Sequence, residues 1–342
     1  MVNVVNVTPA KHAFVPMKDK TGRENLVLIV KYTFAVDAAG RVSLVTDDSA
    51  PYPSMGDSYN GEDGATASIR KPSDLYDYKP GTDVLLIGHA HPLWGARPPD
   101  HVDVRLQVGP VDKRVRAHGL RVWRAALRGG VIAGPARPIT EPVPLIYELA
   151  WGGMDLSDPE HMVGDPRNYV GRGVASDPAR LVDQPAAQLE DPDHPIGSHH
   201  VVPACFGAIH RHWVPRMSFA GTYDAAWEAT KMPLLPDDFD ARHHVSVPHD
   251  QWSPRPLRGD EPVRVTGVSP DGLWQFQLPR VEPRFVTWIE GQRQEHLGHL
   301  DTFLIDADER RVELTWRASA PMPRKYEMVE RALIYEKRVV QL

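Results

Sequence analysis

Apolar and polar residues alternate over long stretches in the two end regions of the chain, which is the pattern of β-strands with one buried face. In the segment VDVRLQV, residues 102–108, every second residue is valine or leucine, and the residues between them are Asp, Arg and Gln. This period of two predicts a half-buried strand. Gly109 and Pro110 follow, and a second extended run begins after them, so we predict a hairpin with its turn at these two residues.

The same alternation returns near the C-terminus. Residues 273–278, LWQFQL, and residues 311–316, RVELTW, again place apolar and polar side chains in turn. We therefore predict a mainly β fold. Residues 1–134 and residues 257–342 are expected to form two antiparallel β regions, with a sandwich or barrel-like arrangement.

The centre of the chain, residues 135–256, has a different pattern. Asp-Pro occurs four times there and apolar periodicity is lost over long stretches, so we expect a loop-rich segment with one or two short helices. The helix candidate is TYDAAWEATKM, for which Thr222 is the predicted N-cap and Pro233 the stop. We expect this helix near residues 222–231, and we expect the three parts of the chain to form one compact unit.

Composition and charge exclude several classes of function. The 45 acidic and 39 basic residues are interspersed, with a formal net charge of -6, so no basic stripe is present to follow a nucleic-acid backbone. No run of apolar residues is long enough to cross a bilayer. The N-terminus lacks the basic start and apolar core of a secretory signal, so we expect a cytoplasmic location. The single cysteine excludes an internal disulfide.

Histidines are concentrated in residues 194–249, which hold eight of the sixteen in the chain. A zinc site needs three or four nitrogen, oxygen or sulfur ligands in a tetrahedral array. The candidates are His199, His210 and His212, but Cys205 has no cysteine partner and no His-Glu-x-x-His helix is present. We expect these histidines to anchor loops, without a metal or other cofactor. A metal-dependent hydrolase that uses this block is the alternative.

No motif for nucleophilic catalysis or nucleotide binding is present. The chain contains no Gly-x-Ser-x-Gly elbow and no glycine-rich phosphate loop. Cys205 lies between Ala204 and Phe206, and we expect it to be a thiol of the core, because a buried free cysteine behaves as a small apolar residue. We therefore expect a protein that is not an enzyme.

The centre is rich in Arg, Trp, Tyr and Gly, which have two common uses. Aromatic rings and guanidinium groups pin long loops, and the same residue types are enriched at protein interfaces. A further class of function to consider for the whole protein is a carbohydrate-binding β-sandwich, for which Trp213, Trp227 and Trp252 would form a flat exposed platform. The candidate binding or structural residues are Trp151, Gly152, Asn168, Gly171, Arg172, Gly173, Phe206, Gly207, Trp213, Arg216, Gly221, Tyr223 and Trp227.

Five long motifs carry a resemblance to a known family. They are YELAWGGMD, NYVGRGV, FGAIHRHWVPRMSFAGTYDAAW, PLLPDDFDARHHVSVPHDQ and LRGDEPVRVTGVSPDGLWQFQLP, in this order. In these motifs the chain resembles the bacterial domain of unknown function 2169, whose members are often encoded beside type VI secretion genes. His249 stands where many relatives have proline, so an essential ligand role for this histidine is not expected.

The resemblance implies an adaptor or chaperone-like role. Such a protein binds a secreted toxin effector and helps to load it onto the spike-tip carrier protein of the type VI machine. The resemblance supplies no catalytic residues, so only partner binding is expected. An effector segment would add a strand to an exposed sheet edge, or it would dock in a groove between the two β regions.

Overall fold

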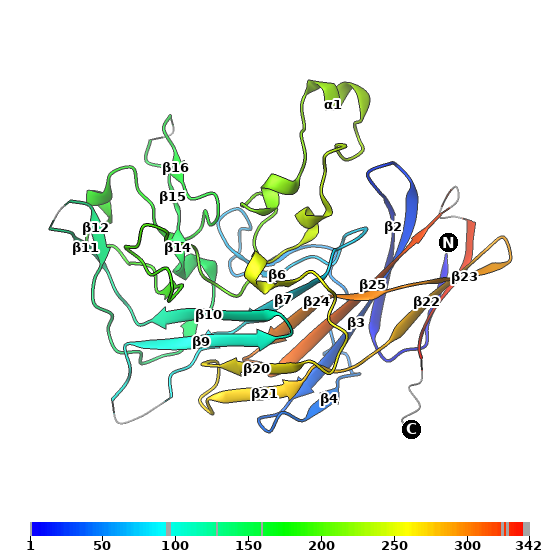
Figure 1. Ribbon diagram of the computed structural model, residues 1–342, viewed down its shortest axis with the longest axis horizontal. Helices are drawn as coiled ribbons and strands as arrows, with labels where there is room; N and C mark the ends of the chain where they lie inside the picture. Colours follow the sequence, from blue (N-terminus) through cyan, green and yellow to red (C-terminus); the bar gives the residue numbers. More distant parts are fainter. Residues whose placement is uncertain are drawn as a thin grey trace.

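The computed structural model describes residues 2–93, 97–127, 129–158, 160–322, 325 and 328–337 (Figure 1). In this part of the chain the fold is mainly β, as predicted, and the longer strands lie in three sheets. The seven-stranded sheet has the order β19 (Trp252–Ser253), β7 (Thr82–Ile87), β24 (His299–Asp306), β25 (Arg311–Pro321), β3 (Glu24–Val36) and β2 (Lys11–Lys18), and β4 (Val42–Leu44) also pairs with β3.

Two smaller sheets and several short pairs complete the strands. The five-stranded sheet has the order β18 (Leu189–Glu190), β10 (Val111–His118), β9 (His101–Val108), β20 (Pro262–Thr266) and β21 (Leu273–Gln277). The four-stranded sheet has the order β1 (Asn3–Asn6), β26 (Val329–Glu336), β22 (Pro283–Ile289) and β23 (Gln292–His296). The two-stranded pairs are β5 (Ser58–Tyr59) with β6 (Ile69–Lys71), β8 (His89–Ala90) with β13 (Val143–Pro144), β11 (Trp123–Ala125) with β12 (Val131–Ala133), β14 (Trp151–Gly152) with β17 (Arg172–Gly173), and β15 (Met154–Asp155) with β16 (Val163–Gly164).

Each of the three large sheets combines strands from both end regions of the chain. In the seven-stranded sheet β24 pairs in parallel with β7, and β25 pairs antiparallel with β3. In the other sheets β20 pairs with β9, and β1 pairs in parallel with β26. The parallel pairs depart from the antiparallel regions that we predicted. Their strands are far apart in sequence, so no hairpin turn forces them to run in opposite directions.

The hairpin predicted at Gly109 and Pro110 is confirmed. β9 and β10 pair antiparallel, with Val108 opposite Val111. Gly109 has a φ of 53°, a left-handed conformation that glycine adopts without strain. Apolar residues of β9 such as Leu106 are fully buried, so the alternation of the sequence does mark the buried face.

The predicted short helix is present, but it is shorter and has another N-cap. α1 spans Ala225–Thr230, and the Asp224 carboxylate accepts a hydrogen bond from the backbone N–H of Trp227 (2.8 Å). Thr222, the predicted cap, instead donates from its N–H and its hydroxyl to Asp238 (3.0 and 2.8 Å). Both residue types cap helices, and the bond to Asp238 keeps Thr222 outside α1. The remaining helical turns are η1 (Tyr147–Leu149), η2 (Pro178–Leu181), η3 (Arg216–Phe219), η4 (Ala241–His244) and η5 (His249–Gln251).

The two faces of the seven-stranded sheet are both buried, and they differ in chemistry. Along β3 the alternate residues Leu26, Leu28 and Val30 belong to the main apolar core, which also contains buried side chains of the five- and four-stranded sheets. The other face carries buried charged residues, including Lys31 of β3 and Arg317 of β25. Among the described helices, none is long and apolar enough to cross a membrane.

Candidate functional site

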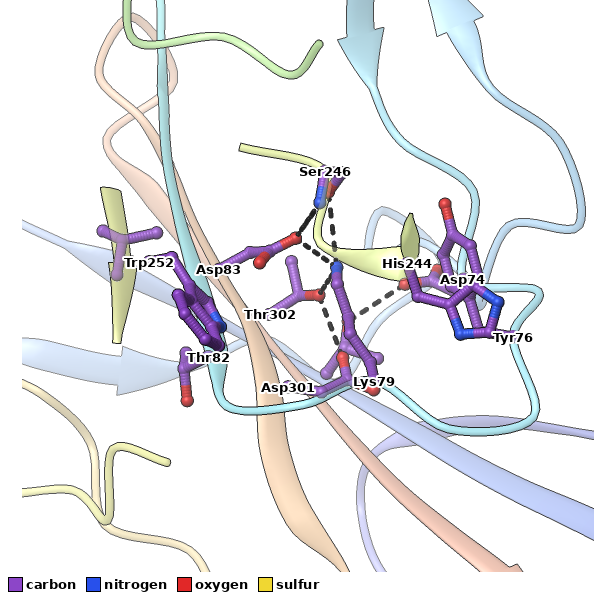
Figure 2. Close-up of polar contacts among 12 residues, drawn as sticks. Asp74, Tyr76, Lys79, Thr82, Asp83, His244, Ser246, Trp252, Asp301 and Thr302 are labelled. Atoms are coloured by element: carbon purple, nitrogen blue, oxygen red, sulfur yellow. Dashed lines mark hydrogen bonds and ion pairs between the residues drawn. The ribbon is translucent and has the colours of Figure 1, made fainter. Parts of the chain in front are cut away.

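Paired charges lie buried on the second face of the seven-stranded sheet (Figure 2). Lys79 Nζ lies 2.5 Å from Asp83 Oδ2 and donates a hydrogen bond to Thr302 Oγ1 (3.0 Å). Ser246 donates to the same Asp83 oxygen from its backbone N–H (2.7 Å) and from its hydroxyl (2.6 Å). These contacts hold the loop that contains Ser246 against β7 and β24.

Two further ion pairs extend this buried network towards β25 and β3. Arg317 Nε lies 2.6 Å from Asp301 Oδ2, and Lys31 Nζ lies 2.6 Å from Asp74 Oδ2. Burial acts to lower the pKa of Lys31 and to raise the pKa of Asp74. The attraction between the two charges, with Glu313 also beside Lys31 and the Ser54 N–H donating to Asp74, outweighs burial, so the pKa of Lys31 is raised and that of Asp74 is lowered. Both groups are therefore charged in the folded protein.

The network has the composition of a catalytic site but not its accessibility. A lysine beside a serine and an aspartate is a set that can activate a serine nucleophile. Here Lys79 is 1% exposed, and Asp83 and Ser246 are 0% exposed, so a substrate has no access to the hydroxyl. We assign the network a structural role, because a buried charge is stable only beside its partner and so fixes each covering segment in one position.

Several of the candidate residues are buried anchors of the central loops. Trp213 is 1% exposed and packs edge-on against Tyr147, with 5.5 Å between the ring centroids. Arg216 is 2% exposed and donates hydrogen bonds to the carbonyl oxygens of Ile209 (2.6 Å) and His243 (3.0 Å). Phe206 is fully buried as well. These three side chains therefore make internal contacts of the central loops.

The second group of candidates surrounds Asn168, which is fully buried. Its side-chain amide donates to the carbonyl oxygens of Tyr147 and Trp151 (both 2.9 Å). At Gly152, a Cβ would lie 2.3 Å from the Asn168 carbonyl oxygen, so this position admits no side chain. A Cβ at Gly171 would lie 2.4 Å from Asn168 Nδ2, and a Cβ at Gly173 would lie 2.5 Å from the Trp151 ring. Arg172 lies between these two glycines, at the start of β17. This group fixes the pairing of β14 with β17.

The structure does not assemble a metal site from the candidate histidines. His210 is 5% exposed, and its Nε2 lies 2.9 Å from the carbonyl oxygen of Ala67. His212 is exposed and stacks on Tyr169, and His199 lies in an exposed turn. Within the described ranges, no group of three His, Cys, Asp or Glu residues is placed to hold a metal ion. The hydrolase alternative therefore has no ligand set in this part of the chain.

The three tryptophans proposed as a carbohydrate platform do not form one. Trp213 is buried, and Trp227 and Trp252 are partly buried. The indole N–H groups of the latter two donate to the carbonyl oxygens of Leu234 (2.9 Å) and Pro80 (2.8 Å), respectively. Since a sugar platform needs exposed coplanar rings, the carbohydrate-binding hypothesis loses its support.

An open surface remains beside the segment of residues 217–239, which we call the arm. The arm carries α1 and projects from the sheets next to the hairpin of β2 and β3 (Figure 1). Between them lies a cleft of about 390 Å³, adjoined by a second hollow of about 300 Å³. Its apolar lining includes Met17, Leu75, Tyr223, Leu234 and Phe239.

Contacts with the hairpin tip and at its base hold the arm in this position. Lys20, at the tip of the hairpin, donates to the carbonyl oxygen of Phe239 (3.4 Å), and Gly22 packs against Leu234. At the base of the arm His244 Nδ1 donates to the carbonyl oxygen of Tyr78 (2.5 Å). Burial lowers the pKa of His244 to about 3, so this histidine is neutral and serves as a fixed donor.

The charges around the cleft are unevenly matched. Arg211 is exposed and lies over the Tyr76 ring, 5.4 Å from its centroid, and it forms no ion pair with any described residue. Lys20 donates hydrogen bonds only to carbonyl oxygens among the described residues. The Asp19 carboxylate is already bound by groups of its own turn, since it accepts hydrogen bonds from Thr21 (2.6 and 2.8 Å). Asp77 also lines the cleft, 3.5 Å from the neutral His244 ring, so the cleft presents the basic groups of Arg211 and Lys20 together with this carboxyl group.

The sequence-based reasoning identified Tyr223 and Gly221 in this region but missed the hairpin tip. Gly221 has a φ of 84° and turns the chain into the arm. The Asp19 turn is a recognisable turn motif, but nothing in its sequence indicates that the arm, about 200 residues later in the chain, packs against it. The buried network was missed for the same reason, because its charged residues come from four separate parts of the chain.

These features define a class: a β-rich protein with a charged but sealed interior face and an open cleft suited to binding. The family follows from comparison with known sequences. Residues 21–317 match the family described as an uncharacterized protein conserved in bacteria, domain of unknown function 2169, so the chain belongs to this family. Comparisons with curated proteins and with solved structures gave no match.

Proposed function

We propose that this protein is a non-enzymatic adaptor that binds a partner protein in the cleft between the arm and the β2–β3 hairpin. By the resemblance given above, the partner is a secreted toxin effector, which the adaptor helps to load onto the spike-tip carrier of a type VI secretion system. The observation that carries the proposal is this open cleft, with apolar walls and two exposed basic side chains, Lys20 and Arg211, that form no ion pair with any described residue.

The surface of the arm supports partner binding. Met217, Tyr223 and Met232 are 58%, 52% and 61% exposed, although large apolar side chains are usually buried. Methionine and tyrosine are common at protein interfaces because they adapt to, or anchor in, a facing surface. Of these side chains Tyr223 lines the cleft, so a partner in the cleft would cover it.

Docking in the cleft is favoured over addition of a strand to a sheet edge. The edge strand β2 contains Pro16, which lacks the N–H that a new strand would need. The edge strand β23 has the sequence QRQEH, with polar and charged side chains throughout. β21 is covered by the turn at Gly40, where a Cβ would lie 2.1 Å from the Gln275 carbonyl oxygen. Such features protect sheet edges from pairing.

The charges indicate what kind of partner segment fits. Lys20 and Arg211 can pair with carboxylates, and the apolar wall at Leu234 favours an apolar side chain. We therefore expect the effector to present an apolar side chain flanked by Asp or Glu. Charged contacts of this kind mainly set the association rate and the choice of partner, and they weaken as salt is added.

The experiment is capture of proteins encoded by the neighbouring genes when the whole locus is expressed. We expect a neighbouring gene product to co-purify with the wild-type chain and to be lost with Arg211→Glu and Tyr223→Ala. A variant at an exposed site outside the cleft, Met154→Ala, serves as the control and should retain it. Equal capture by all variants would contradict the assignment of the cleft.

A further inference from the structure

A second pocket, of about 200 Å³, lies away from the arm. Its walls come from β6, from the end of β7 with β8, from β13 and from residues 205–207. Residues of the arm and of the β2–β3 hairpin do not line it. It is therefore a separate site from the cleft assigned above.

The floor of this pocket is apolar and uncharged. Ile69, Leu145, Tyr147 and Cys205 line it and are almost completely buried. The Cys205 thiol donates a hydrogen bond to the Leu145 carbonyl oxygen (3.2 Å), and burial raises the pKa of the thiol to about 11. The floor therefore favours an apolar group over a charged one.

The rim of the pocket is polar, and most of its polar groups already have partners. His89 Nδ1 lies 2.8 Å from Asp308 Oδ2, and Asn60 donates to the Ser68 hydroxyl (2.8 Å). Arg70 differs, because it is exposed and forms no ion pair with any described residue. Arg70 acts on the nearby Asp306 carboxyl but is held by no ion pair, so it is the rim group that can bind a carboxylate, while Asp308 is bonded to His89.

Gly207 indicates that the pocket is kept open. A Cβ at this position would have Ile69 O, Cys205 Sγ and Tyr147 Cδ2 as its nearest neighbours, at 3.7 to 3.9 Å. All three atoms belong to residues that line the pocket, so a side chain here would point into it. These are ordinary contact distances and the backbone is not left-handed, so neither packing nor conformation requires glycine.

Gly88, on the opposite wall, provides the contrast. It has a φ of 130°, and its Cβ would lie 3.0 Å from Asp308 Oδ1. Glycine is required there by the backbone and by the close approach. At Gly207, the space that the missing side chain leaves belongs to the pocket.

We propose that this pocket binds a small carboxylic acid with a leucine-sized apolar group, which lies over Gly207 while the carboxylate pairs with Arg70. The size is adequate, since an apolar cavity of about 150 Å³ holds benzene. The acid is either a free small molecule or the C-terminal residue of a polypeptide. Both present the same chemistry to the pocket.

The test is saturation-transfer NMR on the full chain with N-acetyl-L-leucine and with the peptide N-acetyl-Ala-Ala-Leu. We expect transfer to the leucine methyl groups of both probes, and tighter binding of one of them identifies the source. Gly207→Leu should abolish the transfer and Gly207→Ala should reduce it. Arg70→Gln should weaken binding about ten-fold, as expected for loss of one charge-assisted hydrogen bond.

A matched variant controls for the added bulk. Gly56 is exposed, its backbone is not left-handed, and a Cβ there would have no heavy atom within 4 Å, so Gly56→Leu should bind both probes as the wild type does. Transfer that survives Gly207→Leu, or that is absent from the wild type, overturns the proposal. Equal binding of N-acetyl-L-leucinamide, which lacks the carboxylate, overturns the role of Arg70.

Discussion

The motif of residues 206–227 has two parts whose large side chains have different surroundings. In residues 206–216, Trp213 and Arg216 are 1% and 2% exposed, and each ring or guanidinium group contacts an internal partner. In residues 217–227, at the start of the arm, Met217 and Tyr223 are more than half exposed. Trp213 and Arg216 therefore pin the fold in the first part, whereas Met217 and Tyr223 remain available to a partner in the second.

The largest expected effect is a loss of stability in the buried part. Trp213→Ala should lower the free energy of unfolding by about 4 kcal/mol, because it removes a fully buried indole and leaves a cavity. His212→Ala, one residue away but exposed, should change it by about 0.5 kcal/mol or less. Urea denaturation of both variants measures the difference, and equal midpoints would show that the two positions are not distinguished by burial.

A break in the buried network should cost nearly as much. Lys79→Met leaves Asp83 as an unpaired buried charge, and we expect the free energy of unfolding to fall by about 3 kcal/mol. If the cost comes from that charge, the double variant Lys79→Met with Asp83→Leu should recover much of it. Denaturation of the single and double variants provides the measurement; a double variant no more stable than the single one would argue against this cause.

Acid should weaken the junction between the arm and the sheets. Burial lowers the pKa of His244 to about 3 in the folded chain, whereas an unfolded histidine titrates near 6.5. Below pH 6.5 the unfolded state binds the proton and the folded state does not, so stability present above this pH is lost as the pH falls towards 3.

For His244 alone, this linkage removes about 2 kcal/mol between pH 7 and pH 5. His244→Asn, which keeps a donor for the Tyr78 carbonyl, should flatten this part of the stability profile. Thermal or urea unfolding at the two pH values checks the prediction. An unchanged slope in the variant would assign the acid sensitivity to other groups.

The smallest effect on stability is expected on the arm itself. Tyr223→Ala should change the free energy of unfolding by about 0.5 kcal/mol or less, because the side chain is half exposed and meets mainly Trp227. If Tyr223 instead supports the arm, the variant should melt several degrees below the wild type. Calorimetry of the two proteins separates these outcomes.

The sequence predicted local features well and long-range ones poorly. Residues 102–108 form the expected strand because a period of two is a local property of one segment. The short helix was also expected, but Thr222 and Asp224 are both good caps, and only the position of Asp238 decides between them. The pairing of β7 with β24 joins segments more than 200 residues apart, and no local pattern indicates it.

The candidate site shows the same limit. The motif pointed to Trp213, Arg216 and Tyr223 together, but residue type alone did not show which of them is buried. Gly207 stood out only as part of the motif, and its position in a pocket depends on Ile69 and Tyr147 from other segments. Burial is a property of the assembled sheets and loops, so it had to come from the structure.

Hydrogen–deuterium exchange of the chain, alone and with a captured neighbouring gene product, tests the central claim most directly. We expect the partner to protect amides of the arm and of the hairpin tip at residues 17–23. Amides of residues 206–210 should exchange equally slowly in both samples, because these residues are already buried. Protection confined to other surfaces, with the arm and the hairpin tip unchanged, would contradict the account.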